Sequence, residues 1–405
     1  MIPKETLTEV IASQRAFWDK AETGTLREKD EEVLIEEGFA LLITGIRRCG
    51  KSTFLNQLFK KHKKKYYLNL EDPRLDGFEL ADFNKVEMIM NELYGTGGTY
   101  FFDEIQTIEK WEKFIRYLID KKEKVVITGS NASLLSQELG TKLTGRHLQI
   151  ELFPFSYTEF LTIKKTTPSI KSFEDYLNKG GFPEFLKKEN RAIHHELLSD
   201  VIMKDIAVRY GIKNNAYLNK IAIHLISNVG NEFSYNSIKK MLEIKSVQSV
   251  IDYVYYLENT YLIFTVPRFS FSYKQQLANP KKAYSIDNGF SYSNSASFSK
   301  DKGKMLENCV FLELRRKWKD IFYFRDNNEC DFVIKQKDAI IQAIQVCFDF
   351  TQENKEREIK GLISAMNQFN LTTGLILTYK QEDEFIVEGK KIIIKPVWKW
   401  LLEKS

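Results

Sequence analysis

The sequence is poor in the residues that form metal cages and disulfide frameworks. Among 405 residues there are only four cysteines and five histidines. The cysteines are Cys49, Cys309, Cys330 and Cys347. They show no C-x-x-C spacing, and the histidines are scattered apart from one adjacent pair. The sequence therefore predicts neither a zinc site nor a disulfide scaffold, and it favours buried, reduced thiols.

Long apolar runs are also missing. No run approaches the ~20 residues of a membrane-spanning helix, and the first five residues lack the basic-then-apolar order of a signal peptide. We therefore expect a cytoplasmic protein with no membrane partner. The net charge of +5 permits contact with nucleic acid without requiring it. The basic run at 60–65 is more typical of a solvated helix end than of a nucleic-acid patch.

The most informative segment is Gly45-Ile46-Arg47-Arg48-Cys49-Gly50-Lys51-Ser52, which fits the P-loop pattern G-x-x-x-x-G-K-[ST]. An apolar run at 39–44 precedes it, and apolar residues at helical spacing follow from Thr53. Glycines let the backbone N–H groups face phosphate oxygens, and a helix N-terminus favours their negative charge. We expect residues 45–53 to bind ATP, with Lys51 at the β- and γ-phosphates and the Ser52 hydroxyl on Mg²⁺.

A second apolar run, at 99–102, ends in the acids Asp103 and Glu104. Buried carboxylates are costly unless they are paired or bound to a metal. Beside a P-loop, Mg²⁺ would supply the partner of Asp103, and Glu104 would polarise the attacking water. The spacing therefore predicts a nucleotide-hydrolysing site.

Two further residues are candidates with open alternatives. Asn131 follows the apolar strand at 125–128 and could bind the γ-phosphate or the water, as could Ser130, or Asn131 could cap the next helix. Arg146 precedes a strand at 148–152. It could be an arginine finger, in cis or from a neighbouring subunit, or it could form a surface salt bridge.

The pattern of runs predicts a multidomain α/β protein. Alternating strands and helices over 39–155 are typical of a parallel sheet with helices on both faces. A helical arm at 1–38 precedes this core, and a charged helical lid at 156–230 follows it. Two helices and two β-rich runs at 231–290 have the order of a winged helix, although the second helix carries few basic residues. A last α/β domain occupies 291–405.

Several of these segments together resemble an AAA-type ATPase family of bacteria and archaea that carries a C-terminal domain of unknown function. The segments are 42–52, 101–106, 129–135, 284–289, 306–308, 329–334 and 344–347. The resemblance spans almost the whole chain. It implies an AAA-like core, a winged-helix segment and a restriction-endonuclease-like end domain.

The end domain lacks part of a nuclease site. Such a site needs an acid on a helix, an Asp at a strand end and a Glu-x-Lys on the next strand. Glu307 and Asp331 match the first two positions, but Gln345 and Cys347 replace the last pair. We therefore expect no cleavage here, and Glu307 could instead pair with Arg325.

The leading hypothesis is a Mg²⁺-dependent ATPase whose cycle moves or gates the winged-helix and end domains. DNA, a protein partner and further copies of the chain are candidate partners. The alternative is an ATP-gated switch or interaction module with slow turnover, and the least favoured is an ATP-regulated nuclease. The adjacent pair Asp103 and Glu104 favours hydrolysis.

Overall fold

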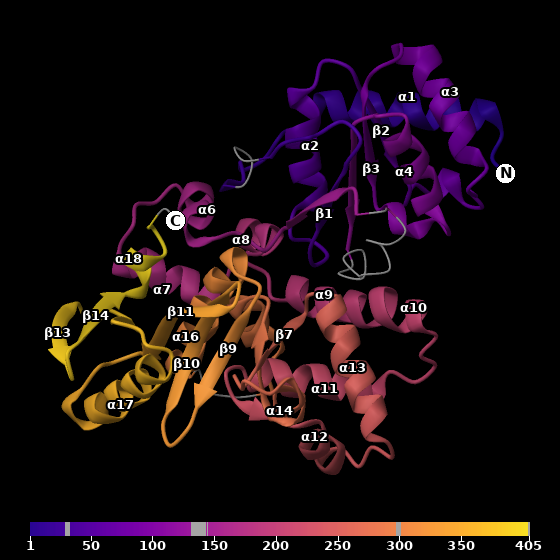
Figure 1. Cartoon of the computed structure of the whole chain (residues 1–405). Helices are drawn as coiled ribbons and strands as arrows, with labels where there is room; N and C mark the ends of the chain where they lie inside the picture. The colour runs from indigo at the N-terminus through magenta and orange to yellow at the C-terminus, as the bar shows by residue number, and fades with distance from the viewer. Residues whose placement is uncertain (29–32, 131–142, 144, 297–300, 404–405) are drawn as a thin grey trace. The chain divides into compact units, whose positions relative to one another are not determined.

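The chain folds into two compact units, which comprise residues Met1–Phe153 and Pro154–Ser405. The computed structural model describes residues 1–28, 33–130, 143, 145–296 and 301–403 (Figure 1). Within these residues, no helix combines the length and the apolarity that crossing a bilayer requires. Each unit has its own sheets and its own core, so each is described by itself.

The first unit is built on a five-stranded parallel sheet with strand order β2-β3-β4-β1-β5. The strands are β1 (Ala40–Thr44), β2 (Lys65–Asn69), β3 (Thr99–Asp103), β4 (Val125–Gly129) and β5 (His147–Glu151). Every residue of β1, β3 and β4 is buried. Central strands of a parallel sheet are covered on both faces, so they form continuous apolar runs in the sequence. All five strands predicted for this unit are confirmed.

Helices cover both faces of this sheet. The helices are α1 (Lys4–Lys20), α2 (Lys51–Lys61), α3 (Asp82–Tyr94) and α4 (Trp111–Asp120), with short 3-10 turns at Pro73–Leu75 and Ile105–Thr107. On one face, Phe102 of β3 lies edge-on to Phe83 of α3 and Phe114 of α4. On the other face, Phe59 of α2 contacts Phe101 of β3. Successive strand residues thus supply the two cores in alternation.

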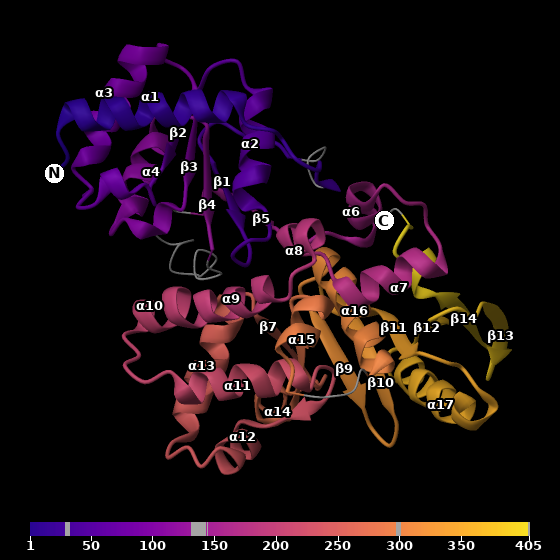
Figure 2. The ribbon, with the colours of Figure 1, turned by 180° about the vertical axis from the view of Figure 1, so that it is seen from behind.

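The N-terminal helix, within the arm predicted for 1–38, packs into this unit. It packs against the edge strand β2 and against α3 (Figure 2). Leu7, Val10 and Ile11 are buried in the core that α3 and α4 also share. At its far end Trp18 stacks on Tyr67 of β2 with 3.6 Å between ring centroids. The helix therefore covers a sheet edge and buries apolar side chains there.

The second unit begins with helices and continues into two sheets. Its helices are α6 (Tyr157–Lys164), α7 (Ile170–Lys179), α8 (Pro183–Lys188), α9 (Ala192–Asp200), α10 (Val208–Tyr210), α11 (Ala216–Ser227), α12 (Tyr235–Met241), α13 (Val247–Asn259), α14 (Tyr273–Ala278), α15 (Asn288–Asn294), α16 (Lys302–Lys317), α17 (Gln352–Gln368) and α18 (Val397–Trp400), and a π-helix (Val201–Ala207) joins α9 to α10. The three segments predicted as separate domains from 156 onward lie within this single compact unit.

The smaller sheet of this unit has the order β6-β8-β7 and is antiparallel. Its strands are β6 (Glu232–Phe233), β7 (Ile263–Pro267) and β8 (Lys281–Ser285). Helices α11, α12 and α13 pack together beside it. The two helices and two longer strands predicted for 231–290 are confirmed, whereas the two-residue β6 and the short α14 were not predicted.

The larger sheet is mixed and has the order β13-β14-β12-β11-β10-β9. Its strands are β9 (Ile321–Arg325), β10 (Glu329–Gln336), β11 (Ala339–Cys347), β12 (Thr373–Thr378), β13 (Asp383–Val387) and β14 (Lys390–Pro396). Helix α17 buries its apolar side against one face of this sheet. The approach is close: a Cβ atom on Gly361 would collide with the backbone carbonyl of Glu329. On the other side, Phe332 of β10 faces Phe311 of α16 and Tyr284 of β8.

The packing of α1 yields a first prediction. Replacing Leu7, which is fully buried, by alanine should lower the free energy of unfolding of the first unit by about 2–5 kcal/mol, because the cavity cannot fully collapse. The matched control is Phe17→Ala on the same helix, where the side chain is 70% exposed. Denaturant unfolding measures both variants. Equal, small effects would show that α1 is a dispensable arm.

Candidate functional site

The P-loop lies between β1 and α2, at the carboxyl end of the sheet. Gly45 has a φ of 151°, and a Cβ atom there would collide with the carbonyl oxygen of Leu152. Gly50 has a φ of 103°, a left-handed conformation that favours glycine. The Cys49 thiol donates to the Leu152 oxygen over 3.4 Å, so the segment after β5 supports the loop. The two glycines of the motif are thus required by the backbone itself.

Lys51, the first residue of α2, is 5% exposed. Its Nζ donates to the carbonyl oxygens of Gly45 and Ile46 over 3.1 and 3.2 Å. The same Nζ is 3.9 Å from Oε1 of Glu104. The ammonium therefore lies folded over its own loop, where incoming phosphate oxygens would replace the carbonyls as acceptors.

Asp103 ends β3 and is almost completely buried. The hydroxyl of Thr128 donates to its Oδ1, and the Tyr67 hydroxyl is 3.4 Å from its Oδ2. Burial raises the pKa of Asp103, and neighbouring Glu104 raises it further, whereas hydrogen bonds from Thr128 and Ser52 lower it. The carboxylate is thus held by hydroxyls at a place where its charge is costly without a cation.

For Glu104, the neighbouring groups have the opposite net effect on the pKa. Burial raises its pKa, but Lys51, Gln106 and Ser130 together bring the pKa below its ordinary value. Ser130 donates to both carboxylate oxygens, over 3.0 and 3.2 Å, and the Gln106 amide donates to Oε2. The residue also has a left-handed backbone, with φ of 54°. The carboxylate is therefore ionised and fixed next to Lys51.

The donor set at this edge suits a magnesium ion. Ser52 and Asp103 already share a hydrogen bond, so a hydroxyl and a carboxylate oxygen lie together at the start of α2. Hard oxygen donors of this kind are what Mg²⁺ binds, and it completes its shell with water and nucleotide phosphates. A buried carboxylate with a raised pKa fits such an ion, because the ion's charge would offset the cost of burial.

The two remaining candidate residues are not part of this arrangement. Asn131 lies outside the described residues, so its role stays a prediction. Arg146 immediately precedes β5, and its carbonyl oxygen accepts from Ala40 N–H at the start of β1. It is therefore at the amino end of the sheet, and its guanidinium pairs with Asp120 over 2.5 Å. A cis arginine finger does not fit this conformation, whereas a contribution from another subunit stays a prediction.

Two residues that organise the site were not predicted from the sequence. Thr128 joins the two acids, because its hydroxyl donates to Asp103 and accepts from Glu104 N–H over 3.0 Å. Gln106 holds the Glu104 carboxylate. A signal existed for both, since Thr128 ends the apolar run at 125–128 beside the acid-bearing strand, and Gln106 lies two residues after Glu104.

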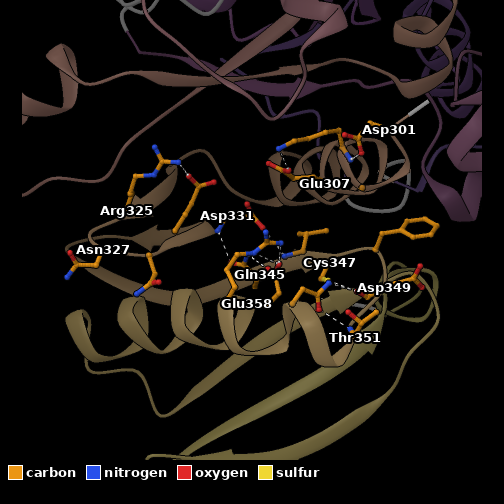
Figure 3. A pocket seen from close by; sticks show the side chains of 18 residues that line it. Asp301, Glu307, Arg325, Asn327, Asp331, Gln345, Cys347, Asp349, Thr351 and Glu358 are labelled. Atoms are coloured by element: carbon orange, nitrogen blue, oxygen red, sulfur yellow. Dashed lines mark hydrogen bonds and ion pairs between the residues drawn. The ribbon is translucent and has the colours of Figure 1, made fainter. Parts of the chain in front are cut away.

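The acids of the C-terminal domain also come together, around a cavity of about 930 Å³ in the second unit. Glu307 of α16, Asp331 of β10, and Gln345 and Cys347 of β11 line it (Figure 3). Glu307 does not pair with Arg325, which was one predicted alternative. It pairs with Lys282 and Lys304 instead. Arg325 pairs with Glu232 and Glu329.

Comparison with protein families divides the chain into three segments. A family model described as an AAA domain matches residues 37–161. Two models, each described as a domain of unknown function, match residues 170–300 and 302–400. The P-loop and the two acids therefore lie within the segment that matches the AAA domain.

Relatives match the chain over nearly its whole length. It is 35% identical to an uncharacterized protein of Methanocaldococcus jannaschii, over 99% of this chain and 96% of the relative. It is 27% identical to an uncharacterized protein of Haemophilus influenzae, over 90% of this chain and 94% of that protein. Among solved structures, AMPPCP-bound DnaA from Aquifex aeolicus is similar at 15% identity and a TM-score of 0.28, over 64% of this chain and 89% of that chain.

The raised pKa of Asp103 yields a prediction about pH. A folded pKa above the ordinary 3.8 means that the folded state binds more protons, so stability falls as pH rises from 3.8 through the folded pKa. Asp103→Asn removes this loss. At pH 8 without nucleotide it should raise the midpoint of thermal unfolding by roughly 3 °C, about 1 kcal/mol for a unit of this size.

The gain should be smaller at pH 5, where more of the wild-type carboxyl is protonated. The control is Asp76→Asn, because Asp76 is exposed. A gain that is the same at pH 5 and pH 8, or that the control reproduces, would contradict the assignment.

Proposed function

Because the chain belongs to a family of proteins in which an AAA domain is followed by two domains of unknown function, we propose that it binds ATP with Mg²⁺ and hydrolyses it. The observation that carries the proposal is the meeting of Lys51, Asp103 and Glu104 at one edge of the sheet. Lys51 Nζ lies 3.9 Å from Glu104, and Asp103 shares a hydrogen bond with Ser52. Side chains suited to bind phosphate, to hold a metal ion and to act as a base thus lie close together.

Each residue has a distinct task in this proposal. The N–H groups of the loop and the ammonium of Lys51 bind and orient the phosphates. Ser52 and Asp103 would hold Mg²⁺, which supplies positive charge to the phosphate oxygens when bound. Glu104, kept ionised by Lys51, Gln106 and Ser130, orients the attacking water and accepts its proton. Thr128 positions both acids relative to each other.

A gated switch with slow turnover is the second candidate, and the contacts of Glu104 favour it. Ser130 and Gln106 occupy both of its carboxylate oxygens. A water molecule must replace at least one of these donors before Glu104 can accept a proton. The basal rate therefore depends on how readily nucleotide binding releases Glu104, and a partner could control that step.

In this proposal, the cycle of ATP binding and hydrolysis moves or gates the second unit. The helices α11, α12 and α13 and the sheet order β6-β8-β7 support the winged-helix interpretation of 231–290. DNA is the candidate partner of this segment. The last turn of α12 carries Lys239 and Lys240, whereas α13 carries Asp252 and exposed Tyr255. Any contact would therefore be with the phosphate backbone more than with base edges.

The catalytic assignment makes a prediction for two variants. Lys51→Ala should abolish saturable ATP binding and lower hydrolysis by on the order of 10²–10³-fold, because the loop loses its phosphate-binding cation. Glu104→Gln should keep ATP binding and lower hydrolysis by on the order of 10²–10⁴-fold, because the base is lost. Phosphate release measures turnover, and a fluorescent ATP analogue measures binding.

Lys61→Ala is the matched control, since Lys61 is an exposed lysine at the other end of α2. It should hydrolyse ATP at the parent rate. Parent-like hydrolysis in both Lys51→Ala and Glu104→Gln would refute the ATPase proposal. Tight ATP retention with turnover far below one per minute in the parent (on the slow side of the usual range) would favour the switch.

The DNA proposal makes a separate prediction. Duplex DNA should stimulate ATP hydrolysis at about 50 mM salt and lose most of that effect at about 200 mM, because phosphate contacts release counterions. Lys239→Ala combined with Lys240→Ala should remove the stimulation and leave basal hydrolysis unchanged. If DNA changes the rate of ATP hydrolysis at neither salt concentration, the winged-helix segment is a packing or protein-binding module.

A further inference from the structure

A lysine side chain is buried in the second unit, at the centre of three carboxylates. Lys282, on β8, has a side chain that is only 2% exposed. Its Nζ lies 3.2 Å from Glu307 Oε1, 2.7 Å from Glu329 Oε1 and 3.1 Å from Asp331 Oδ1. We call Glu307, Glu329 and Asp331 the acidic cluster. A lysine surrounded in this way is unusual, because lysines are almost never fully buried unless paired.

The second oxygen of each carboxylate also has a donor from the chain. Glu307 Oε2 is 2.9 Å from the Lys304 ammonium, and Asp331 Oδ2 accepts from Val346 N–H over 3.0 Å. Glu329 Oε2 accepts from the guanidinium of Arg325. The Tyr284 hydroxyl further donates to Glu307 over 2.7 Å. All six oxygens of the acidic cluster thus have hydrogen-bond or ion-pair partners within the protein.

Lys282 and Glu329 favour each other's charged forms, whereas burial and Glu307 raise the pKa of Asp331 to about 6, against the lowering effect of Lys282. Burial alone would lower the pKa of Lys282, but Tyr284, Asp331, Glu307 and Glu329 raise it well above its ordinary value, so the amine stays an ammonium. Lys282 in turn lowers the pKa of Glu329, against the effect of burial. Removing one member would leave the others as uncompensated buried charges, which is strongly destabilising.

The partners of Lys282 come from different parts of the unit. Lys282 belongs to the three-stranded sheet, Glu307 to α16, and Glu329 and Asp331 to β10 of the six-stranded sheet. The segment just after β7 also reaches the six-stranded sheet, where Phe269 N–H donates to the Tyr323 carbonyl of β9 over 2.8 Å. The boundary predicted at 290–291 is therefore crossed by a buried ion-pair network.

We propose that Lys282 is an internal cation lock: its ammonium neutralises the acidic cluster in place of an ion from solvent, keeps divalent cations out of it, and joins the two sheets so that they move as one body.

The ion pairs of Lys282 also bear on whether the adjoining cavity can bind a metal ion. Glu307 and Asp331 face the cavity from α16 and β10, the positions where a nuclease would hold its metal (Figure 3). Their oxygens are already taken by fixed cations and N–H donors. The amide of Gln345 is likewise engaged, donating to Glu358 over 2.7 Å and accepting from Asp331 N–H over 3.2 Å. A metal ion at Glu307 and Asp331 would therefore have to displace these partners or share the oxygens with them.

A double-mutant cycle on the full chain tests the lock. Lys282→Met should lower the midpoint of thermal unfolding of the second unit by roughly 10 °C, because three buried carboxylates lose their common cation. Asp331→Asn sets the reference shift in the parent, where the loss of the ion pair with Lys282 opposes the gain from removing a buried charge. In the Lys282→Met background the same change should shift the midpoint upward relative to that reference, because only a repelling charge is removed. The difference between the two shifts measures the electrostatic coupling.

Lys281→Met is the matched control. Lys281 is the neighbouring residue on β8, and successive strand residues face opposite sides, so its side chain points away from the acidic cluster. Asp331→Asn should shift the midpoint equally in the parent and in Lys281→Met. If the shift is also the same in the Lys282→Met background, the proposed role of Lys282 is wrong.

Two further measurements address the other parts of the proposal. Mn²⁺ without nucleotide should leave the midpoint of the second unit unchanged in the parent, and stabilisation that Asp331→Asn abolishes would overturn the exclusion of divalent cations. Hydrogen exchange should be slow in β8 and β10 of the parent and should rise in both strands together, several-fold, in Lys282→Met combined with Asp331→Asn. A rise confined to one strand would show that the sheets are not joined through Lys282.

Discussion

The parallel pairing of the first sheet is the constraint on which the candidate nucleotide site depends. Thr44 of β1 is in register with Gly129 of β4 and with Glu151 of β5, and Asn69 of β2 is in register with Asp103 of β3. Parallel strands bring their carboxyl ends to one edge, so residues distant in the sequence meet there. This register brings the P-loop, the adjacent acids Asp103 and Glu104, and Ser130 to the same edge of the sheet. A slip by one residue would turn Asp103 to the other face of the sheet.

The same constraint explains which parts of the site the sequence could predict. A P-loop and a strand ending in two acids are local patterns, and each can be recognised within about ten consecutive residues of the sequence. The tasks of Thr128 and Gln106 are not local, because they depend on where the Glu104 carboxylate points after a left-handed residue. Arg146 is the converse case. The parallel direction of β5 puts it at the amino edge of the sheet, away from the P-loop of its own chain, so that a contribution from another subunit is the part of the prediction that stays open.

Fold prediction had a similar limit. The buried strands were predictable because they are continuous apolar runs, whereas β13, whose residues are largely exposed, gives no such signal. The buried face of α1 is apolar, but its sequence does not say that the face covers the β2 edge. Lys282 was missed because lysine in a strand normally faces solvent. Only the fold reveals that its partners, up to 49 residues away, surround it.

The two acidic sites described here differ in how the free-energy cost of burying their carboxylates is offset. In the first unit, Asp103 is held by neutral hydroxyls and its pKa is raised, so its charge is fully compensated only when a ligand brings a cation. In the second unit, Lys282, Lys304 and Arg325 pair with the acids of the cluster without any ligand. A site that lacks compensation responds to a ligand, because binding supplies the missing free energy. A site whose acids already have cationic partners gains less from a ligand in this way. The electrostatics therefore favour the first unit over the second as the part of the chain whose stability depends on a bound ligand.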